Sequence, residues 1–277
     1  MITHILMTRF NVRTNEGDLS TERLSPSWLR ERLDLFNKYC FPSITYQTIL
    51  PDVWIVMFDA QTPDEIKRLI ENSIKGIKFI VPVYVDYFDV GIAKKLVTKY
   101  LPHGANWLIT TRLDNDDALH PHFLEVVRSH AREGQREFIN IPTGLVVANK
   151  RCYRKNDWSS PFISLSETAH EPTTVWIDKH HLLSRHGAIR QLNLRDGWIQ
   201  IIHGGNLANQ VRGVRVPFAS INLRTLPTLL ANSIERESVV DLLFDNSLGL
   251  FRRYTGSAFR FARTKLRDWH DTRCKHN

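Results

Sequence analysis

Short apolar runs alternate with amphipathic stretches along the first 113 residues, and this alternation constrains the fold more than any other feature. The clearest run is residues 53–58, which lies between Pro51 and Asp59. A continuous apolar run of this length is typical of a strand that is buried on both faces of a parallel sheet. The sequence therefore predicts strands that helices cover on both sides.

Helical periodicity fills the gaps between these runs. A helix is expected to begin at Ser25-Pro26, because apolar residues recur at helical spacing from there to Tyr39. The segment Thr62-Pro63-Asp64-Glu65 reads as a capping box with proline at the first helical position. Alternating strands and helices predict an α/β fold with a doubly wound, mostly parallel sheet and helices on both faces. Strands are expected over residues 2–10, 53–58, 79–85 and 107–113, and helices over 25–39, 62–74 and 92–100.

The pattern is less regular after residue 121, and we expect one large α/β domain over residues 1–225 with a helical, basic extension over 226–277. In this part the strands at 137–140 and 144–153 are expected to be more exposed than the earlier ones. The remaining expectations are a helix over 121–134, a loop-rich stretch over 154–172, a short strand over 198–203 and a helix over 226–250.

The acidic segment Asp114-Asn115-Asp116-Asp117 directly follows the strand that ends at Leu113. Ligands bind open α/β sheets at the carboxyl ends of the strands, and clustered carboxylates repel one another unless a cation or solvent neutralises them. Asp114 and Asp116 are expected to point to the same side of an extended chain, where they could hold Mg²⁺ or Mn²⁺ and, through it, a diphosphate. The alternative is a solvated acidic turn in which Asp117 caps the next helix.

Six segments along the chain are TRFN at 8–11, YCFPSI at 39–44, FD at 58–59, RLDNDD at 112–117, SPFISLSE at 160–167 and WIQIIHGGN at 198–206. Together and in this order they resemble the bacterial rhamnosyltransferase family, and the resemblance covers roughly residues 1–210. Their central D-x-D-D is shared with many glycosyltransferases of the GT-A type, so the resemblance indicates glycosyl transfer more firmly than it indicates the sugar.

The resemblance implies a GT-A-like, Rossmann-related fold with a donor half at about residues 1–120 and an acceptor half at about 121–225. It implies transfer of a sugar, for which L-rhamnose is one candidate, from a nucleotide-diphosphate donor to a glycan or lipid-linked acceptor, as in polysaccharide biosynthesis. A divalent ion, Mn²⁺ or Mg²⁺, is implied at Asp114 and Asp116. Because GT-A enzymes often add a later histidine to the metal, His203 is the candidate third ligand, its alternative being a hydrogen-bonded core or turn histidine.

Three residues at strand ends are expected to bind the donor, in addition to Asp114. Arg112 precedes the acidic segment and could neutralise a phosphate. Arg9 ends the first strand and either meets a phosphate or is an ordinary surface charge. Asp59 ends the second strand, where it either accepts hydrogen bonds from the base or ribose or serves as a turn residue.

An inverting transferase also needs a general base beside the acceptor hydroxyl. Glu167 is the candidate catalytic residue, because it lies in a segment that resembles the family and in a predicted loop. Asp157 and Asp178 compete with it, and each of the three carboxylates could instead be a solvent-exposed surface group. The histidines of His180-His181 lack cysteine or glutamate partners at ligand spacing, so we assign them to the acceptor-side surface.

The net charge of +8 is concentrated at the end of the chain. Residues 251–277 hold eight basic and two acidic residues, so this stretch alone has a net charge of +6. Aromatic residues between Phe251 and Trp269 fall near one helical face with arginines beside them, which is typical of a helix on an anionic membrane. The alternative is a terminal helix whose aromatic stripe docks on the protein's own core. Nucleic acid is not expected as a partner, because no reader motif accompanies the charge.

No run of about 18 apolar residues and no cleavable leader pattern occurs, and the three cysteines are widely spaced. These features predict a cytoplasmic protein that could attach peripherally to the inner face of the membrane. Two other functions are weighed: a metal-dependent nucleotidyltransferase, which normally has a glycine-rich phosphate loop that residues 10–24 lack, and a non-catalytic basic module that binds membrane or nucleic acid. The second leaves the acidic segment without a role.

Overall fold

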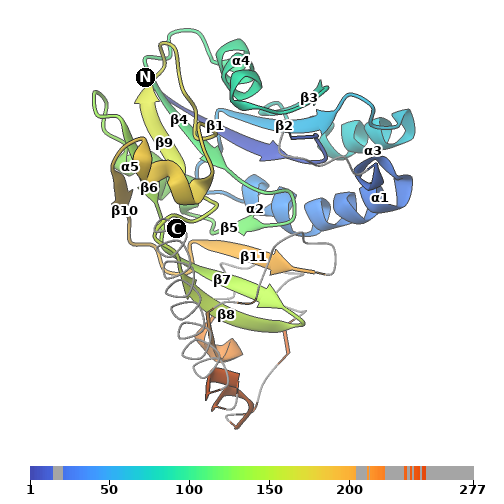
Figure 1. Ribbon diagram of the computed structural model, residues 1–277, viewed down its shortest axis with the longest axis vertical. Helices are drawn as coiled ribbons and strands as arrows, with labels where there is room; N and C mark the ends of the chain where they lie inside the picture. Colours follow the sequence, from blue (N-terminus) through green and yellow to red (C-terminus); the bar gives the residue numbers. More distant parts are fainter. Residues whose placement is uncertain are drawn as a thin grey trace, which may run out of the picture.

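The computed structural model describes residues 1–14, 21–203, 211, 213–221, 234–235, 238, 240–243 and 245–247. Within these residues the strands form a large and a small sheet, and Figure 1 shows the small sheet beneath the large one. The large sheet has the order β10-β6-β9-β4-β1-β2-β3. Its strands are β1 (Ile2–Arg9), β2 (Val53–Asp59), β3 (Ile80–Val85), β4 (Trp107–Arg112), β6 (Glu137–Asn140), β9 (Ser164–Thr168) and β10 (Ile189–Gln191).

The centre of the large sheet is parallel, as the apolar runs predict. β1 pairs in parallel with both β2 and β4, and β2 pairs in parallel with β3. β9 is antiparallel to its neighbours β4 and β6. The order β3-β2-β1-β4 is the doubly wound arrangement, in which the carboxyl ends of β2, β1 and β4 meet at one edge of the sheet.

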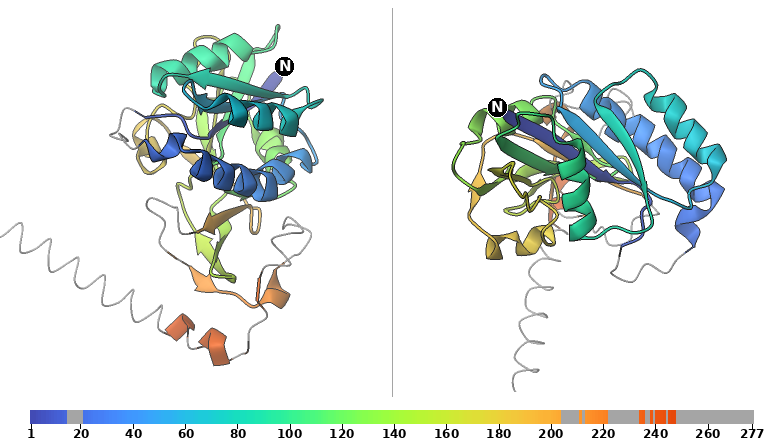
Figure 2. Two further views of the ribbon diagram at one scale, coloured as in Figure 1. Left: turned by 90° about the vertical axis from the view of Figure 1, so that its right-hand side faces the viewer. Right: turned by 90° about the horizontal axis from the view of Figure 1, so that it is seen from above.

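Helices cover both faces of this sheet, because successive side chains of each strand point to opposite sides. On β1, Leu6 packs with the helices of one face, and Ile5 and Met7 pack with α4 on the other. Figure 2 shows α1 and α4 on opposite sides of the sheet. The predicted α/β class with helices on both faces is confirmed. The α-helices are α1 (Pro26–Leu35), α2 (Phe41–Thr45), α3 (Asp64–Ile74), α4 (Val90–Tyr100) and α5 (Phe123–His130).

The small sheet has the order β12-β8-β7-β11-β5. β7 and β11 pair in parallel. The ring of Trp198 on β11 lies so close to Gly144 on β7 that a Cβ on Gly144 would be 2.1 Å from it. Trp198 in turn stacks on Phe162, with ring centroids 4.9 Å apart, in the core between the sheets. The strands of the small sheet are β5 (Ala118–Leu119), β7 (Thr143–Ala148), β8 (Arg151–Asn156), β11 (Trp198–Ile202) and β12 (Val214–Arg215).

Two expectations for residues 137–153 are wrong. Residues 137–140 form a buried strand of the large sheet, because Arg190 neutralises the buried carboxylate of Glu137 at 2.7 Å. Residues 144–153 form a hairpin of β7 and β8, since Asn149 and Lys150 have φ values of 48° and 61° that turn the chain. The large sheet thus takes strands from both predicted halves of the domain.

The helix predicted from Ser25 is interrupted by one wider turn. Ser25 caps α1 through a hydrogen bond from the amide of Trp28, and α1 then runs into a π-helical turn, η2 (Phe36–Cys40), before α2. The amide of Phe41 donates to the carbonyl of Phe36, five residues back. Pro42 has no amide hydrogen to donate, and a π-turn ahead of it shifts the helix without breaking it.

The capping box predicted at Thr62 is also absent, although α3 begins where it was expected. Pro63 is the N-cap residue, and the hydroxyl of Thr62 donates instead to the carbonyl of Asp59 at 2.7 Å. Asp64 and Glu65 still occupy the first turn, where their negative charges interact favourably with the helix dipole. The hydroxyl of Thr62 therefore stabilises the end of β2 and not the start of the helix.

The aromatic and basic segment at 251–269 lies outside the described residues, as does most of the helix expected over 226–250. Among the residues that are described, no helix combines the length and apolar character needed to cross a bilayer.

Candidate functional site

The acidic segment lies where the sequence predicts, at the carboxyl end of β4, but it is a turn and not an extended chain. The amide of Asp117 donates to the carbonyl of Asp114 at 3.3 Å. The expectation that Asp114 and Asp116 share one side of an extended strand is therefore wrong. Asp116 and Asp117 are buried and Asp114 is half-buried, because the turn folds back between the two sheets.

Asp116 meets two side chains from distant parts of the chain. Its Oδ2 accepts a hydrogen bond from Nη1 of Arg32 at 2.7 Å and lies 3.0 Å from Nε2 of His203. Arg32 Nη1 is 3.3 Å from the same histidine nitrogen. Helix α1 supplies the arginine and the end of β11 supplies the histidine, so three elements converge on this carboxylate.

Burial and charge act differently on the two buried aspartates. Burial raises the pKa of Asp116, but hydrogen bonds and charges from His203 and Arg32 outweigh this and hold the pKa below its usual value. Burial and the neighbouring carboxylates raise the pKa of Asp117 well above its usual value. Asp117 Oδ1 accepts the amide of Ile201 at 2.8 Å and so ties the turn to β11. Asp116 is the ionised member of the pair.

The atoms at Asp116 and His203 fit a divalent cation in one respect. Adjacent ligands of an octahedral Mg²⁺ with bonds of about 2.1 Å lie about 3.0 Å apart, which matches the separation of these two atoms. However, Arg32 already directs a positive charge at both, and no cluster of three or more His, Cys, Asp or Glu side chains with metal-binding geometry occurs among the described residues. Two of the three predicted ligands are together, and a cation there requires Arg32 to move.

Arg9 and Arg112 form a second cluster around Trp176. Their guanidinium carbons lie 4.5 Å and 3.9 Å from the centroid of the indole ring. The indole Nε1 is buried and has no hydrogen-bond partner. Burial lowers the pKa of Arg112 to about 10, with a further lowering from Arg9 that Asp114 opposes. This cluster presents donors and positive charge, which suit an anion such as a phosphate.

Asp59 is buried at the end of β2, but its carboxylate is engaged within the protein. Oδ2 pairs with Nη2 of Arg23 at 3.1 Å, and Oδ1 accepts the amide of Gln61 at 2.8 Å. The side chain of Asn11 accepts the amide of Asp59 at 3.1 Å. Both carboxylate oxygens of Asp59 therefore have partners within the protein.

Hydrogen bonds connect the end of β2 with the acidic turn. Asn115 Nδ2 donates to the carbonyl of Phe10 at 2.6 Å, and the next residue, Asn11, holds Asp59. Arg9 lies in the same segment. The predicted donor-binding residues thus occupy one continuous edge of the sheet, formed by the ends of β2, β1 and β4.

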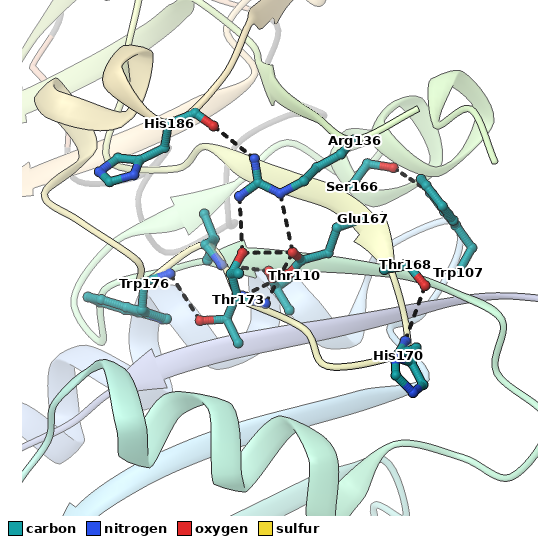
Figure 3. Close-up of polar contacts among 12 residues, drawn as sticks. Trp107, Thr110, Arg136, Ser166, Glu167, Thr168, His170, Thr173, Trp176 and His186 are labelled. Carbon is teal, nitrogen blue, oxygen red and sulfur yellow. Dashed lines mark hydrogen bonds and ion pairs between the residues drawn. The ribbon is translucent and has the colours of Figure 1, made fainter. Parts of the chain in front are cut away.

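Glu167 is the predicted residue that the structure does not bring to this edge. β9 runs antiparallel to β4, and Glu167 lies beside Leu108, in the opposite half of β4 from Arg112. Figure 3 shows its carboxylate beside Thr173 of the following loop and Arg136. The carboxylate accepts the amides of Thr173 and Thr174 at 3.1 and 2.7 Å and faces Arg136 at 3.5 Å. With 2 % of its surface exposed, Glu167 stabilises the loop between β9 and Trp176.

Asp178, in contrast, lies against the arginine cluster. Nη1 of Arg112 donates to the Asp178 carbonyl at 3.3 Å, and the Asp178 carboxylate is 2.9 Å from Nε2 of His186. The hydrogen bond with His186 lowers the pKa of Asp178, so this partly exposed carboxylate is ionised. His180 also lies near Arg112. Burial lowers the pKa of His180 below its usual value, and the positive charge of Arg112 adds to this effect.

Three site residues were not predicted from the sequence. Arg32 falls on the apolar stripe of α1, beside Leu29 and Leu33, and a charge on a buried stripe is a signal that could have found it. Arg23 and Trp176 carry no such periodic signal. Long-range folding alone brings them to Asp59 and Arg112.

The fold and the site define an α/β protein with an acidic turn and an arginine cluster at the carboxyl edge of its parallel strands. Residues 4–215 match the model of a family described as "Putative rhamnosyl transferase". The chain belongs to this family of glycosyltransferases. No protein with a curated description matches the chain.

Several solved structures resemble the chain at low sequence identity. TarS residues 1–349 of S. aureus in complex with UDP is 11% identical, with a TM-score of 0.42 over 72% of this chain and 60% of that one. The same protein with UDP-GlcNAc gives 12% identity and a TM-score of 0.39, over 74% and 60%. A 4-diphosphocytidyl-2C-methyl-D-erythritol synthase gives 10% and 0.39, over 70% and 91%. The chain thus spans about 60% of the length of the TarS structures.

Proposed function

We propose that the chain transfers a sugar, with L-rhamnose as the first candidate, from a nucleoside-diphosphate donor to a glycan or lipid-linked acceptor. Family membership over residues 4–215 supports the reaction class. The observation that carries the proposal is the convergence of Arg9, Arg112 and the acidic turn at one edge of the sheet. Cations and an ionised aspartate side by side suit a charged donor whose diphosphate leaves during the reaction.

In this proposal the arginine cluster holds the donor diphosphate. Arg9 and Arg112 would neutralise its charge, and the unpaired indole N–H of Trp176 would donate to a phosphate oxygen. Burial makes these donors more effective than they would be in water, because the surrounding dielectric is low. Developing negative charge on the leaving diphosphate would strengthen all three contacts.

The proposed divalent ion, Mn²⁺ or Mg²⁺, would be held by Asp116 and His203, with Asp114 as the further ligand. Such an ion supplies positive charge to the leaving diphosphate. Asp116 suits the role because it is ionised at neutral pH. Arg32 would release Asp116 when the ion binds, since its Nη1 contacts both proposed ligand atoms.

We assign the general base to Asp178 in preference to Glu167. Asp178 is ionised, partly exposed and in contact with Arg112 through its carbonyl, and His186 holds its carboxylate in place. Glu167 is engaged by its own loop. A base must reach the acceptor hydroxyl within hydrogen-bond distance, which favours a carboxylate that solvent can reach beside the donor cluster.

A turnover assay tests the proposal directly. The full chain, Mn²⁺ and a panel of nucleotide sugars that includes rhamnose donors are incubated with bacterial glycan and lipid-linked glycan acceptors, and release of nucleoside diphosphate is measured. Acceptor-dependent release from at least one donor is expected, and Asp116→Asn should abolish it because the variant removes a charge from the proposed metal site and little packing. Equal release by wild type and variant would contradict the site, and release of pyrophosphate from nucleoside triphosphates would indicate a nucleotidyltransferase.

A further inference from the structure

Arg23 is a buried arginine whose hydrogen-bonding capacity is only partly used. It lies in the short 3₁₀ helix η1 (Glu22–Leu24), and 9% of its surface is exposed. Its Nη2 pairs with the buried carboxylate of Asp59 at 3.1 Å. Its Nε and Nη1 are buried without any hydrogen-bond partner. The described residues contain only two other side chains with such atoms, Tyr84 and Trp176.

Leaving charged donors unpaired in a buried position is unfavourable, since each loses its hydrogen bonds to water without replacement. Such an arrangement persists where the surrounding structure fixes it, and here Asp59 does so. Asp59 is itself fixed by the amide of Gln61 and by Asn11. The guanidinium is therefore held in one place with two nitrogens, Nε and Nη1, whose N–H bonds need acceptors. A ligand with acceptor atoms would supply them.

The position of Arg23 matches one part of a nucleotide. Asp59 ends β2, and β2 and β4 flank β1, so the Arg23 pair lies two strand spacings, about 10 Å, along the edge from the acidic turn. The segment Phe10-Asn11 joins the two places through hydrogen bonds to Asn115 and Asp59. A nucleotide with its diphosphate at Arg9 and Arg112 and its nucleoside along this edge would reach toward Arg23.

We propose that Arg23 is the residue that selects the donor's nucleobase, and that Asp59 positions it for this purpose. A guanidinium only donates hydrogen bonds, so it matches a ring carbonyl oxygen and cannot accept from an exocyclic amino group. The site therefore favours keto bases, such as uracil, thymine or guanine, over their amino counterparts. This inference rests on the proposed function, because it takes the ligand to be a nucleoside diphosphate.

Isothermal titration of the full chain with pairs of nucleotides tests this assignment. UDP and CDP differ at position 4 of the ring, which carries a carbonyl oxygen in UDP and an amino group in CDP. GDP and ADP differ in the same way at position 6. In whichever pair binds, the keto member is expected to bind about tenfold more tightly, which is the usual effect of one hydrogen bond to a charged group. Arg23→Met should remove this preference by weakening keto binding alone.

Two further variants keep the test independent of folding. Arg23→Met leaves Asp59 buried and unpaired, whereas Arg23→Met with Asp59→Asn removes both charges and should fold more readily. The double variant is also expected to lose the keto preference. Arg30→Met, at an exposed arginine of α1 that pairs with Glu65, is the matched control and should retain it.

The possible outcomes separate the inference from the function on which it rests. Binding of nucleotides to wild type without a keto preference overturns the role of Arg23, as does a preference that survives in both Arg23 variants. Equal weakening of all nucleotides and of inorganic pyrophosphate in the variants would make Arg23 a phosphate contact and would also overturn it. No binding of any nucleotide to wild type would contradict the proposed function as well.

Discussion

Glu167 and Asp178 show how strongly the surroundings of a carboxylate decide its use. Glu167 lies near the end of β9, and Asp178 follows that strand in sequence. Glu167 is buried and accepts from Thr173 and Thr174, so its oxygens are occupied by the protein. Asp178 is partly exposed and ionised beside His186. The first carboxylate organises a loop, and the second remains accessible to a substrate.

Single substitutions at these two residues should affect different properties, stability at Glu167 and turnover at Asp178. Glu167→Gln replaces an acceptor by an amide that faces backbone N–H groups and Arg136, so it should lower the free energy of unfolding by roughly 1–3 kcal/mol. Asp178→Asn should reduce turnover roughly 10²-fold or more with donor affinity retained. Chemical unfolding and steady-state kinetics measure the two effects. A stable Glu167→Gln protein that loses turnover while binding donor normally would return the base to Glu167.

At this scale the sequence predicts some parts of the site and misses others for a physical reason. His203 lies 3.0 Å from Asp116, and both residues follow apolar strands whose ends are recognisable in the sequence, while their role as metal ligands stays a prediction. Arg23 and Arg32 were not predicted. An arginine is usually a solvated surface residue, and it is the tertiary fold that buries Arg23 against Asp59 and brings the half-buried Arg32 to Asp116.

Among the elements, the helical stretch from α1 through η2 to α2 does most to define the site. It carries Arg32 on its buried side, aimed at Asp116, while Arg30 points outward and pairs with Glu65. The π-helical turn before Pro42 lies in the same stretch. The position of this element therefore sets how closely a guanidinium approaches the acidic turn.

If Arg32 competes with the proposed metal, removing it should strengthen metal binding. Arg32→Gln is expected to bind Mn²⁺ roughly tenfold more tightly than wild type, which corresponds to about 1.4 kcal/mol of lost competition. Electron paramagnetic resonance of free Mn²⁺ measures the affinity. Arg30→Gln is the control on the same helix and should bind as wild type does. Weaker binding by Arg32→Gln would show that Arg32 orients the ligands and does not compete for them.

Strands and helices could be predicted where a local sequence signal was sufficient, and could not where a residue distant in sequence determines the structure. The run at 53–58 needed only its own apolar residues to be recognised as β2. The burial of Glu137 depends on Arg190, more than fifty residues later. The hydroxyl of Thr62 caps no helix, because its oxygen already accepts a hydrogen bond from Nδ2 of Asn11 at 3.0 Å. Neither of these partners is visible in a local window.

Across the whole chain, the excess of positive charge lies in the last residues and not in the site. The described site uses its arginines against aspartates and an indole ring. The stretch at 251–277 holds a net charge of +6. The domain boundary at residue 225 and the role of the basic extension stay predictions, because their residues lie largely outside the described structure.

We propose that residues 251–269 attach the protein to anionic membrane, and deletion of residues 251–277 tests this. Each basic residue near an anionic surface contributes on the order of 1 kcal/mol, and salt weakens the contribution. The truncated protein should therefore no longer sediment with anionic vesicles, while its transfer to a soluble acceptor should persist. Equal sedimentation of the full and truncated chains would make the segment a packing element.

Thermal unfolding of the full chain with nucleotide sugars, with and without Mn²⁺, tests whether the chain binds the proposed donor. A ligand that binds only the folded state at 100 times its Kd stabilises it by about 2.7 kcal/mol. At least one nucleotide sugar should raise the Tm by several degrees, more so with Mn²⁺, and Asp116→Asn should lose the Mn²⁺-dependent part. A Tm that no nucleotide sugar changes would show that the chain does not bind the proposed donor.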